Sequence, residues 1–443
     1  MHTFNRRRFL QAAGIASAAA ALPRALGAAT PARVVVVGGG FGGATVAKYL
    51  RLWGGGQVAV TLVEPNADHI ACILSNLVLT GALSMDRISL GYNALKTNYG
   101  VAVIQARVTA INYGSGTGKG RVSLSNGRSL DYDHLVLSPG IDFIAPPDNP
   151  GAWDANVTPH AWQAGAQTLL LKKQLASMRD HDTFVMTVPK SPYRCPPGPY
   201  ERACVVADYL KRKRLLFARV VVLDANAGIQ AEPVAFGEAF NHIYKGMIEY
   251  IPDATVSSVI SQTRSIITSA GSWSNVRVLN YIPNQRAAAI GPASSANRGW
   301  PLLNAQGFVP VDPLTYGVSG YPNIHVIGDA CAVPATDGQA VPKSGHMANA
   351  EAKVCADAIL RALNGQAPDT NIATSSACFS PITATTASWL SANFSYGNIY
   401  DAAGKVKGKG MQRVDLGEAP KISGDNYQDM FTWADGLFAD SFI

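Results

Sequence analysis

The chain has 443 residues, of which 47% are hydrophobic and 15% charged, so it can build large apolar cores, and its length predicts two to four domains. Its formal net charge is +7, but four arginines stand in the first 29 residues without an acidic residue, which leaves 33 basic against 30 acidic residues elsewhere. No basic run with interleaved aromatic residues occurs, and this excludes the usual pattern of a nucleic-acid-binding protein.

The first 29 residues have the pattern of an export signal. Paired arginines precede Phe9-Leu10, an Ala-rich apolar run extends from Ala12 to Leu22, and small residues up to Ala29 offer a cleavage site. The apolar run is too short to span a membrane, and no later stretch predicts a transmembrane segment. We therefore expect a twin-arginine signal peptide (1–29) and a periplasmic protein. A basic amphipathic arm is the alternative.

The segment from Arg33 to Tyr49 predicts a dinucleotide-binding turn. Four consecutive valines predict a buried parallel strand, and the spacing G-x-G-x-x-G follows at Gly38, Gly40 and Gly43, where a helix begins. The three glycines permit the tight turn, the approach of the backbone to a pyrophosphate, and close packing of helix on strand. The turn alone does not separate FAD from NAD.

A second strand, Val58 to Val63, follows this helix and ends in an acidic residue. A carboxylate at that position is placed to accept a hydrogen bond from a ribose 2′-hydroxyl. The predicted cofactor contacts of this region are Gly38, Gly40, Phe41, Gly43 and Glu64.

Six cysteines would lie in an oxidising compartment, where disulfides are permitted, but the sequence cannot choose among their pairings. They are Cys72, Cys195, Cys204, Cys331, Cys355 and Cys378. Cys72 lies close behind the nucleotide strand, and it is either a small buried thiol or a thiol beside a flavin ring. Cys204 and Cys355 fall in predicted helices and are expected in the core.

Residues 151–290 predict a second domain with the same strand–helix–strand pattern. Thr183–Val188 and Ala218–Asp224 predict strands on either side of a helix from Arg202 to Leu210. A pyridine-nucleotide reductase carries its second glycine fingerprint there, but this chain has Pro192-Tyr-Arg-Cys-Pro-Pro-Gly-Pro-Tyr-Glu-Arg202. One glycine among four prolines lacks the N–H groups that a pyrophosphate needs, so NAD(P)H is not expected to be the electron donor.

This proline-rich loop offers a thiol and a carboxyl group instead. Cys195 and Glu201 lie before and at the start of the predicted helix, where the helix dipole favours a thiolate and a carboxylate. Glu201 is equally compatible with an ordinary acid in the first helical turn. Further along, Val234–Tyr250 predicts one amphipathic helix.

The chain then returns to the first domain, so the predicted FAD-binding domain is discontinuous (30–150 and 291–369). Tyr321–Ala330 predicts a strand that ends in Gly328 and Asp329, the expected second FAD contact. Lys343 precedes a helix from His346 to Leu363, and it either places a cation near the flavin N1–C2 edge or is a solvated lysine. Residues 370–443 predict a C-terminal interface domain, which ends in a helix over Tyr427–Trp433.

Several motifs occur together along the chain: the twin-arginine leader, Cys72-Ile-Leu-Ser-Asn76, the proline-rich loop, Pro283-Asn-Gln-Arg286, Pro342-Lys-Ser-Gly345 and Ala377-Cys-Phe-Ser380. With them the whole chain resembles the flavoprotein subunit of flavocytochrome c sulfide dehydrogenase, in the FAD-dependent pyridine nucleotide-disulfide reductase superfamily. The resemblance implies an α/β fold with two Rossmann-like domains of the glutathione-reductase type and a C-terminal interface domain.

The resemblance also implies site roles. Cys72 would carry FAD through a thioether, Cys195 and Cys378 would form a redox-active disulfide over the flavin ring, and Glu201 and Lys343 would assist. Sulfide would be oxidised to sulfur or polysulfide, and the electrons would pass to a c-type cytochrome subunit. The chain has no C-x-x-C-H motif, so any haem is expected on that partner, and no metal site is predicted.

The chain departs from the family pattern at Phe379, where a tyrosine is expected, and at Cys331, an additional cysteine that offers an alternative disulfide partner. Two other functions remain open. A sulfide:quinone oxidoreductase shares FAD and a cysteine pair but needs a membrane surface, and a non-catalytic flavoprotein would only carry sulfur. A type II NADH dehydrogenase is disfavoured because the second glycine loop is missing.

Overall fold

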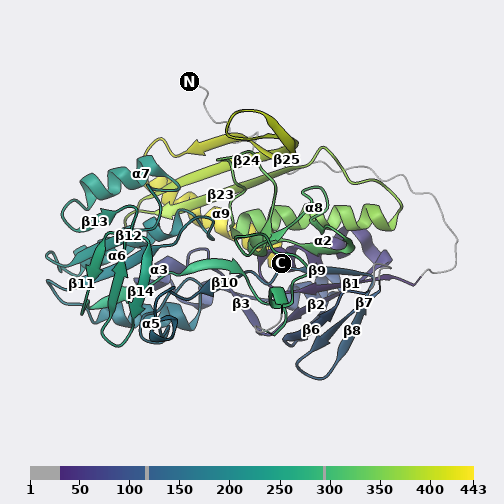
Figure 1. The fold of residues 1–443 in the computed structure, drawn as a ribbon, viewed down its shortest axis with the longest axis horizontal. Helices are drawn as coiled ribbons and strands as arrows, with labels where there is room; N and C mark the ends of the chain where they lie inside the picture. Colours follow the sequence, from purple (N-terminus) through teal and green to yellow (C-terminus); the bar gives the residue numbers. More distant parts are fainter. Residues whose placement is uncertain (1–29, 115–118, 293–295) are drawn as a thin grey trace.

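The computed structural model describes residues 30–114, 119–292 and 296–443, and the predicted signal peptide lies outside them. Two parallel sheets lie toward opposite ends of the molecule, and a third, antiparallel sheet and a long C-terminal helix span the space between them (Figure 1). This architecture confirms the predicted α/β class with two Rossmann-like domains and a C-terminal domain.

The first sheet is built around the valine-rich strand β1. Its strands, in spatial order, are β20 (Gly317–Val318), β21 (Tyr321–Val326), β9 (His134–Leu137), β1 (Ala32–Val37), β2 (Val58–Glu64) and β5 (Ala102–Gln105). All pairs are parallel except β20 with β21. Helices α2 (Phe41–Gly54) and α8 (Gly345–Leu363) lie together over one face (Figure 1).

The glycine turn between β1 and α2 has the predicted close packing. Gly38 has φ +95°, in the left-handed region that favours glycine, and its N–H donates to the carbonyl of Val63 over 2.9 Å. A Cβ atom on Gly43 would lie 1.7 Å from the carbonyl oxygen of Gly38. The helix can therefore begin directly against the end of the strand only because Gly43 has no side chain.

The second sheet has the parallel order β13 (Ile248–Ile251), β12 (Arg219–Asp224), β11 (Thr183–Val188) and β17 (Val278–Asn280). Helices α5 (Ala166–Ala176) and α6 (Gly198–Arg212) accompany it. Both predicted strands are confirmed, and the predicted helix begins four residues earlier, at Gly198 inside the proline-rich loop.

The prediction of one helix over 234–250 is wrong. Helix α7 covers Pro233–Glu238 and continues as a π-helical turn over Ala239–Ile243, and the chain then forms β13. The helical path ends at Ile243, and Gly246, with φ +81°, lies in the turn that leads to β13. Residues Ile248–Ile251 pair with β12, and a short apolar run of this kind fits a strand as well as a helix.

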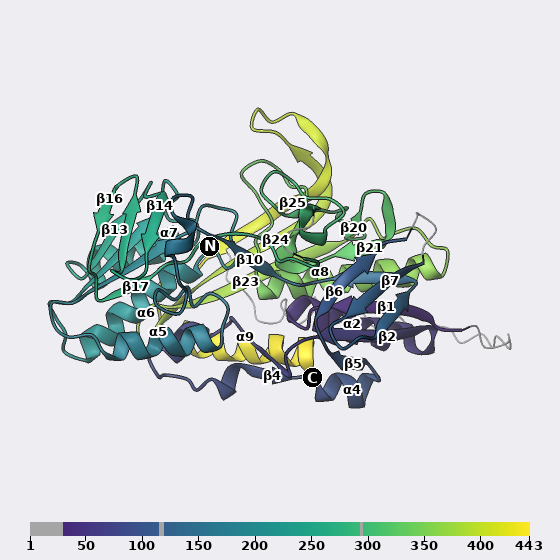
Figure 2. The same ribbon diagram turned by 60° about the horizontal axis from the view of Figure 1, so that its bottom comes forward.

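The C-terminal part is a three-stranded antiparallel sheet of β23 (Ala373–Pro381), β24 (Ala387–Tyr400) and β25 (Val406–Glu418), followed by α9 (Gly424–Phe442). The β24–β25 hairpin projects from the body of the molecule (Figure 2). The predicted C-terminal helix is part of α9, which packs on the first domain, since the ring of Phe41 lies 6.0 Å from that of Phe438 and 5.5 Å from that of Phe442.

Smaller elements connect these layers. The short helices are α3 (Ser75–Leu79) and α4 (Asn93–Tyr99), and the remaining strands are β3 (Asp68–Ile70), β4 (Ser89–Gly91), β6 (Val108–Asn112), β7 (Gly120–Leu124), β8 (Ser129–Tyr132), β10 (Ile141–Ile144), β14 (Val256–Ile260), β15 (Ser265–Thr268), β16 (Gly271–Trp273), β18 (Asn284–Ala287), β19 (Val309–Pro310) and β22 (Cys331–Ala332). Over the described ranges, no helix has the length and apolar character needed to cross a membrane.

Candidate active site

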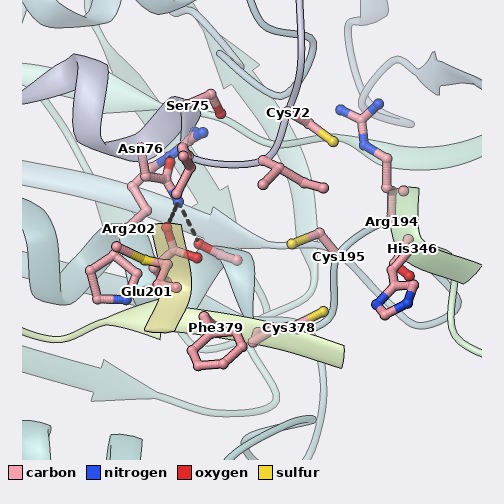
Figure 3. A pocket seen from close by; sticks show the side chains of 18 of the residues that line it. Cys72, Ser75, Asn76, Arg194, Cys195, Glu201, Arg202, His346, Cys378 and Phe379 are labelled. Atoms are coloured by element: carbon pink, nitrogen blue, oxygen red, sulfur yellow. Dashed lines mark hydrogen bonds between the residues drawn. The ribbon is translucent and has the colours of Figure 1, made fainter. Parts of the chain in front are cut away.

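Three cysteines from distant parts of the chain line one small cavity of about 50 Å³, here called the thiol pocket (Figure 3). Cys72 lies between β3 and α3, Cys195 lies between β11 and α6, and Cys378 lies on β23. All three are free thiols in the structure. The structure thus brings the predicted cysteines together, and the disulfide between Cys195 and Cys378 stays a prediction for the oxidised protein.

The backbone holds Cys195 in an uncommon conformation. Its φ is +57°, a left-handed value that non-glycine residues rarely adopt. Its N–H donates to the carbonyl of Lys343 over 2.7 Å, and its carbonyl accepts from the N–H of Gly198 over 2.9 Å. A Cβ atom on Gly198 would lie 2.8 Å from the sulfur of Cys195. The only glycine of the proline-rich loop therefore leaves the space that this sulfur occupies.

Burial controls the protonation of the three thiols. Burial raises the pKa of Cys72, and it raises the pKa of Cys195 and of Cys378 further, because negative neighbours that include Glu201 act in the same direction. The thiols are therefore protonated at neutral pH. This corrects the expectation that the start of α6 favours a Cys195 thiolate, since desolvation outweighs the helix dipole here.

Glu201, in the first turn of α6, is 8% exposed and lies beside the cysteines. Burial raises its pKa to about 7, although a hydrogen bond of 2.9 Å from Nδ2 of Asn76 and the charge of Arg202 oppose this rise. The helix dipole does not keep it fully ionised, contrary to the expectation from its position. A carboxyl group with such a pKa can both accept and release a proton near neutral pH.

Arg202 fixes this acid indirectly. Its side chain is 2% exposed, and its guanidinium lies 4.9 Å from the ring centre of Trp162. The guanidinium donates at 2.6–2.9 Å to the side-chain oxygens of Asn76 and Asn280 and to the carbonyls of His160 and Ala161. Sequence reasoning did not predict roles for Asn76 and Arg202. The only sequence signal was an arginine at the predicted start of a helix, where the helix dipole disfavours a cation.

A second cavity of about 780 Å³ adjoins the thiol pocket, and Cys72, Arg194 and Gly345 line both. Its size is that of a cofactor site. Its lining includes most of the predicted cofactor contacts: Gly38, Gly40, Phe41, Glu64, Cys72, Gly328 and Asp329. Gly43 does not line it and acts through packing beneath the turn. This second cavity is called the dinucleotide cavity below.

The residues of the dinucleotide cavity fit FAD. Buried polar atoms in proteins nearly always have hydrogen-bond partners, yet Oδ1 of Asp329 and Nε2 of His69 have none. Oε2 of Glu64 accepts from the N–H of Gly39 over 2.8 Å and so shapes the glycine turn. Unpartnered donors and acceptors around a glycine-rich floor are what a polar dinucleotide would satisfy.

Lys343 and Cys331 lie outside the thiol pocket and the dinucleotide cavity. The ammonium of Lys343 donates to the carbonyl of Cys331 over 2.5 Å and lies 3.9 Å from the ring centre of Phe308. These residues line a third cavity of about 110 Å³ with Glu351, whose carboxylate is 3.6 Å from the Cys331 sulfur. Lys343 lines neither the thiol pocket nor the dinucleotide cavity, and Cys331 does not share the pocket of Cys195.

Comparisons with known proteins agree with this geometry. Residues 32–178 match the pyridine nucleotide-disulphide oxidoreductase family, and residues 168–283 match the central region of the sulfide dehydrogenase (flavocytochrome c) flavoprotein chain. The chain is thus an oxidoreductase of the flavin-dependent disulfide reductase class, and these relatives imply FAD as its cofactor. A flavocytochrome c flavoprotein chain of Chlorobaculum thiosulfatiphilum is 59% identical over 46 residues, 10% of this chain and 94% of that sequence. The chain belongs to this family of sulfide dehydrogenase flavoprotein chains.

Other relatives match at lower identity over longer stretches. Ferroptosis suppressor protein 1 of Taeniopygia guttata is 36% identical over 110 residues, 25% of this chain and 27% of that protein. The mitochondrial sulfide:quinone oxidoreductase of Dictyostelium discoideum is 24% identical over 68% of this chain and 66% of its own length. The solved sulfide:quinone oxidoreductase of Aquifex aeolicus has a TM-score of 0.71 at 17% identity, covers 93% of this chain and 91% of its own, and shows the common fold.

Proposed function

We propose that this chain oxidises hydrosulfide to sulfur or polysulfide, in the periplasm, and passes the electrons to a c-type cytochrome subunit. One observation carries this proposal: the thiol pocket with Cys195 and Cys378 shares a wall with the dinucleotide cavity, and Cys72 lines both. Family membership supports the same chemistry. The twin-arginine leader supports export.

In this mechanism the oxidised protein carries a disulfide between Cys195 and Cys378. The sulfur of hydrosulfide bonds to one cysteine sulfur while the disulfide breaks, which leaves a persulfide on one cysteine and a thiolate on the other. Loss of two electrons and a proton from this pair forms the disulfide again and releases one sulfur atom. Glu201, with a pKa of about 7, accepts the proton.

The residues that would hold FAD are those of the dinucleotide cavity, with Gly38 and Gly40 at the pyrophosphate, Glu64 at the ribose and Cys72 as a covalent tether. FAD, when bound, accepts the electron pair and can release single electrons to a haem. The chain's own part is to hold the sulfurs next to that cofactor in a buried, largely apolar pocket.

The decisive experiment is an anaerobic sulfide titration of the purified protein, followed in the visible spectrum before and after addition of oxidised cytochrome c. We expect sulfide to bleach the flavin and cytochrome c to restore its colour. Cys195→Ser and Cys378→Ser should keep the flavin and lose the bleaching, while Cys204→Ser, a buried thiol outside the pocket, should retain it. Normal bleaching in both pocket variants would refute the disulfide mechanism.

A separate assay tests the covalent tether between Cys72 and FAD. Acid should release flavin from Cys72→Ser but not from wild type, and equal release from both would contradict the tether.

The likeness to sulfide:quinone oxidoreductases favours quinone as a second candidate for the electron acceptor. One preparation of sulfide-reduced protein can be split into two samples, one mixed with a soluble ubiquinone analogue and the other with oxidised cytochrome c. Faster reoxidation by cytochrome c supports the proposal, and faster reoxidation by quinone would make quinone the acceptor.

Export is tested by fractionation of cells that express the wild-type chain or the triple variant Arg6→Lys/Arg7→Lys/Arg8→Lys. Equal periplasmic yield of the two chains would contradict export through the twin-arginine pathway.

A further inference from the structure

We propose that Arg194 is the binding residue for anionic sulfur in this site. Its guanidinium would hold the hydrosulfide ion, and then the thiolate that the ion generates, at the wall between the thiol pocket and the dinucleotide cavity. The inference rests on the proposed function. It adds a residue that binds the substrate anion, a role for which the sequence motifs offer no candidate.

Arg194 is an incompletely paired buried cation. Its side chain is 13% exposed, and its Nη1 is 3.9 Å from Oδ2 of Asp329, which is too far for a hydrogen bond. Its Nε and Nη2 are buried without any partner. A guanidinium taken out of water loses strong hydrogen bonds, so two free N–H groups in such a place indicate an acceptor that binds there.

Arg194 is positioned to bind an anion in the thiol pocket. It lines both cavities, and its guanidinium lies near the sulfur of Cys72 (Figure 3). Its backbone N–H donates to Oε1 of Gln285 over 2.8 Å, and the next N–H, of Cys195, donates to Lys343, so the loop is fixed. The charge of Arg194 also opposes the burial that raises the pKa of both Cys72 and Cys195. The positive field of Arg194 therefore reaches the two thiols.

The other cationic side chains nearby are not available. The donors of Arg202 are occupied by protein acceptors, and the ammonium of Lys343 points into the third cavity. Burial, aided by Arg194, lowers the pKa of His69 to about 4, and burial lowers the pKa of His346, so both are neutral at neutral pH. Within the described parts of the chain, Arg194 is the cation that lines both cavities with free donors.

The test compares wild type with Arg194→Gln, Arg194→Lys and the control Arg128→Gln, which removes the same charge at an exposed residue that lines neither cavity. The reduced proteins are alkylated with iodoacetamide at a fixed pH of about 8.5, below the raised pKa of Cys195, and the rate of Cys195 modification is followed by mass spectrometry. We expect this rate to fall about tenfold in Arg194→Gln, because loss of the neighbouring cation lowers the thiolate fraction. We also expect the KM for sulfide to rise at least about tenfold, with a smaller change in kcat. Arg128→Gln should match wild type in both.

Equal alkylation rates of Cys195 and equal KM values in wild type and Arg194→Gln would overturn the proposal. If Arg194→Gln does not fold, Arg194→Lys decides, because it keeps the charge but loses the planar fork, and an unchanged KM would overturn the proposal. A shifted flavin potential without a change in alkylation or KM would assign the free donors to the cofactor instead. Alkylation needs no sulfide turnover, so a wild-type protein that fails to oxidise sulfide would refute the proposed function and leave the alkylation test intact.

Discussion

The side-chain amide of Asn76 donates to Oε1 of Glu201 over 2.9 Å, and the Oδ1 of the same amide accepts from Nε of Arg202, also over 2.9 Å. One asparagine on α3 thus joins a buried acid and a buried cation on α6. The acid lies beside the thiols, and the cation is anchored in the core, so the position and the ionisation of Glu201 both depend on this amide.

Asn76→Ala should therefore have two effects. It leaves Nε of Arg202 buried and unpaired, which should lower the free energy of unfolding by about 1–3 kcal/mol. It also removes the donor that opposes burial at Glu201, so the pKa of Glu201 should rise above about 7, and the pH of half-maximal sulfide oxidation should rise with it. Urea unfolding and the pH–rate profile measure these effects. Asn98→Ala, at an exposed position, is the control, and identical results for the two variants would contradict the prediction.

Glu201→Gln should keep the flavin and slow sulfide-driven flavin reduction by about 10²–10⁴-fold, because the amide cannot accept a proton. The rate should also lose the titration near pH 7. Stopped-flow reduction across pH 5.5–9 measures both. The exposed Glu238→Gln serves as the control. A variant that is slow but still titrates near pH 7 would show that another group gives the profile.

Glu232 should make the protein less stable as the pH rises. The residue is fully buried, it accepts from the Ser380 hydroxyl over 2.6 Å, and burial raises its pKa from 4.5 to about 8. Between these two pH values the unfolded chain loses the proton while the folded chain keeps it. This group therefore lowers the free energy of unfolding by about 1.4 kcal/mol per pH unit over that window.

Denaturant unfolding of wild type and Glu232→Gln at pH 5, 7 and 9 measures this slope. The variant should lose relatively little stability at pH 5 and become progressively more stable relative to wild type toward pH 9. Glu238→Gln, at the exposed last residue of helix α7, which follows Glu232 directly, should behave as wild type. If the difference between wild type and Glu232→Gln is constant with pH, the raised pKa of this carboxyl group is refuted.

Gly43→Ala should prevent cofactor binding through the backbone. Its Cβ would lie 1.7 Å from the Gly38 carbonyl oxygen, so the helix must move away from the strand. We expect loss of flavin and a fall in stability of several kcal/mol. The flavin-to-protein absorbance ratio and Tm report on these losses. Gly56→Ala, where an added Cβ meets nothing within 4 Å, should be neutral. Full flavin content in Gly43→Ala would contradict the packing role.

Local pattern was sufficient for the two strand–helix–strand units. The valine run before Gly38 and the segment Thr183–Val188 are short apolar runs of β-forming residues, and both pair in the buried centre of a parallel sheet. Local preference and tertiary packing therefore agree there, and the predicted bounds are nearly correct. The same method failed at 234–250, where an apolar pattern fits a helix and a strand equally well and sheet pairing decided the outcome.

The site was less predictable because its contacts are distant in sequence. The proximity of Cys72, Cys195 and Cys378 came from a family resemblance, since no local pattern joins them. The hydrogen bond between Asn76 and Arg202 spans 126 residues and has no local signature. Lys343 was assigned from its motif, but packing turns its ammonium toward Cys331. Burial also reversed the ionisation that the helix dipole alone predicted at Cys195.

The bond from the N–H of Cys195 to the carbonyl of Lys343 joins a loop of one Rossmann-like domain to the segment that leads into α8 of the other. The thiol pocket lies where three parts of the chain meet, since Cys72 belongs to the first Rossmann-like domain, Cys195 to the second and Cys378 to strand β23 of the C-terminal sheet. None of these parts holds more than one of the three sulfurs, so the site exists only in the assembled chain.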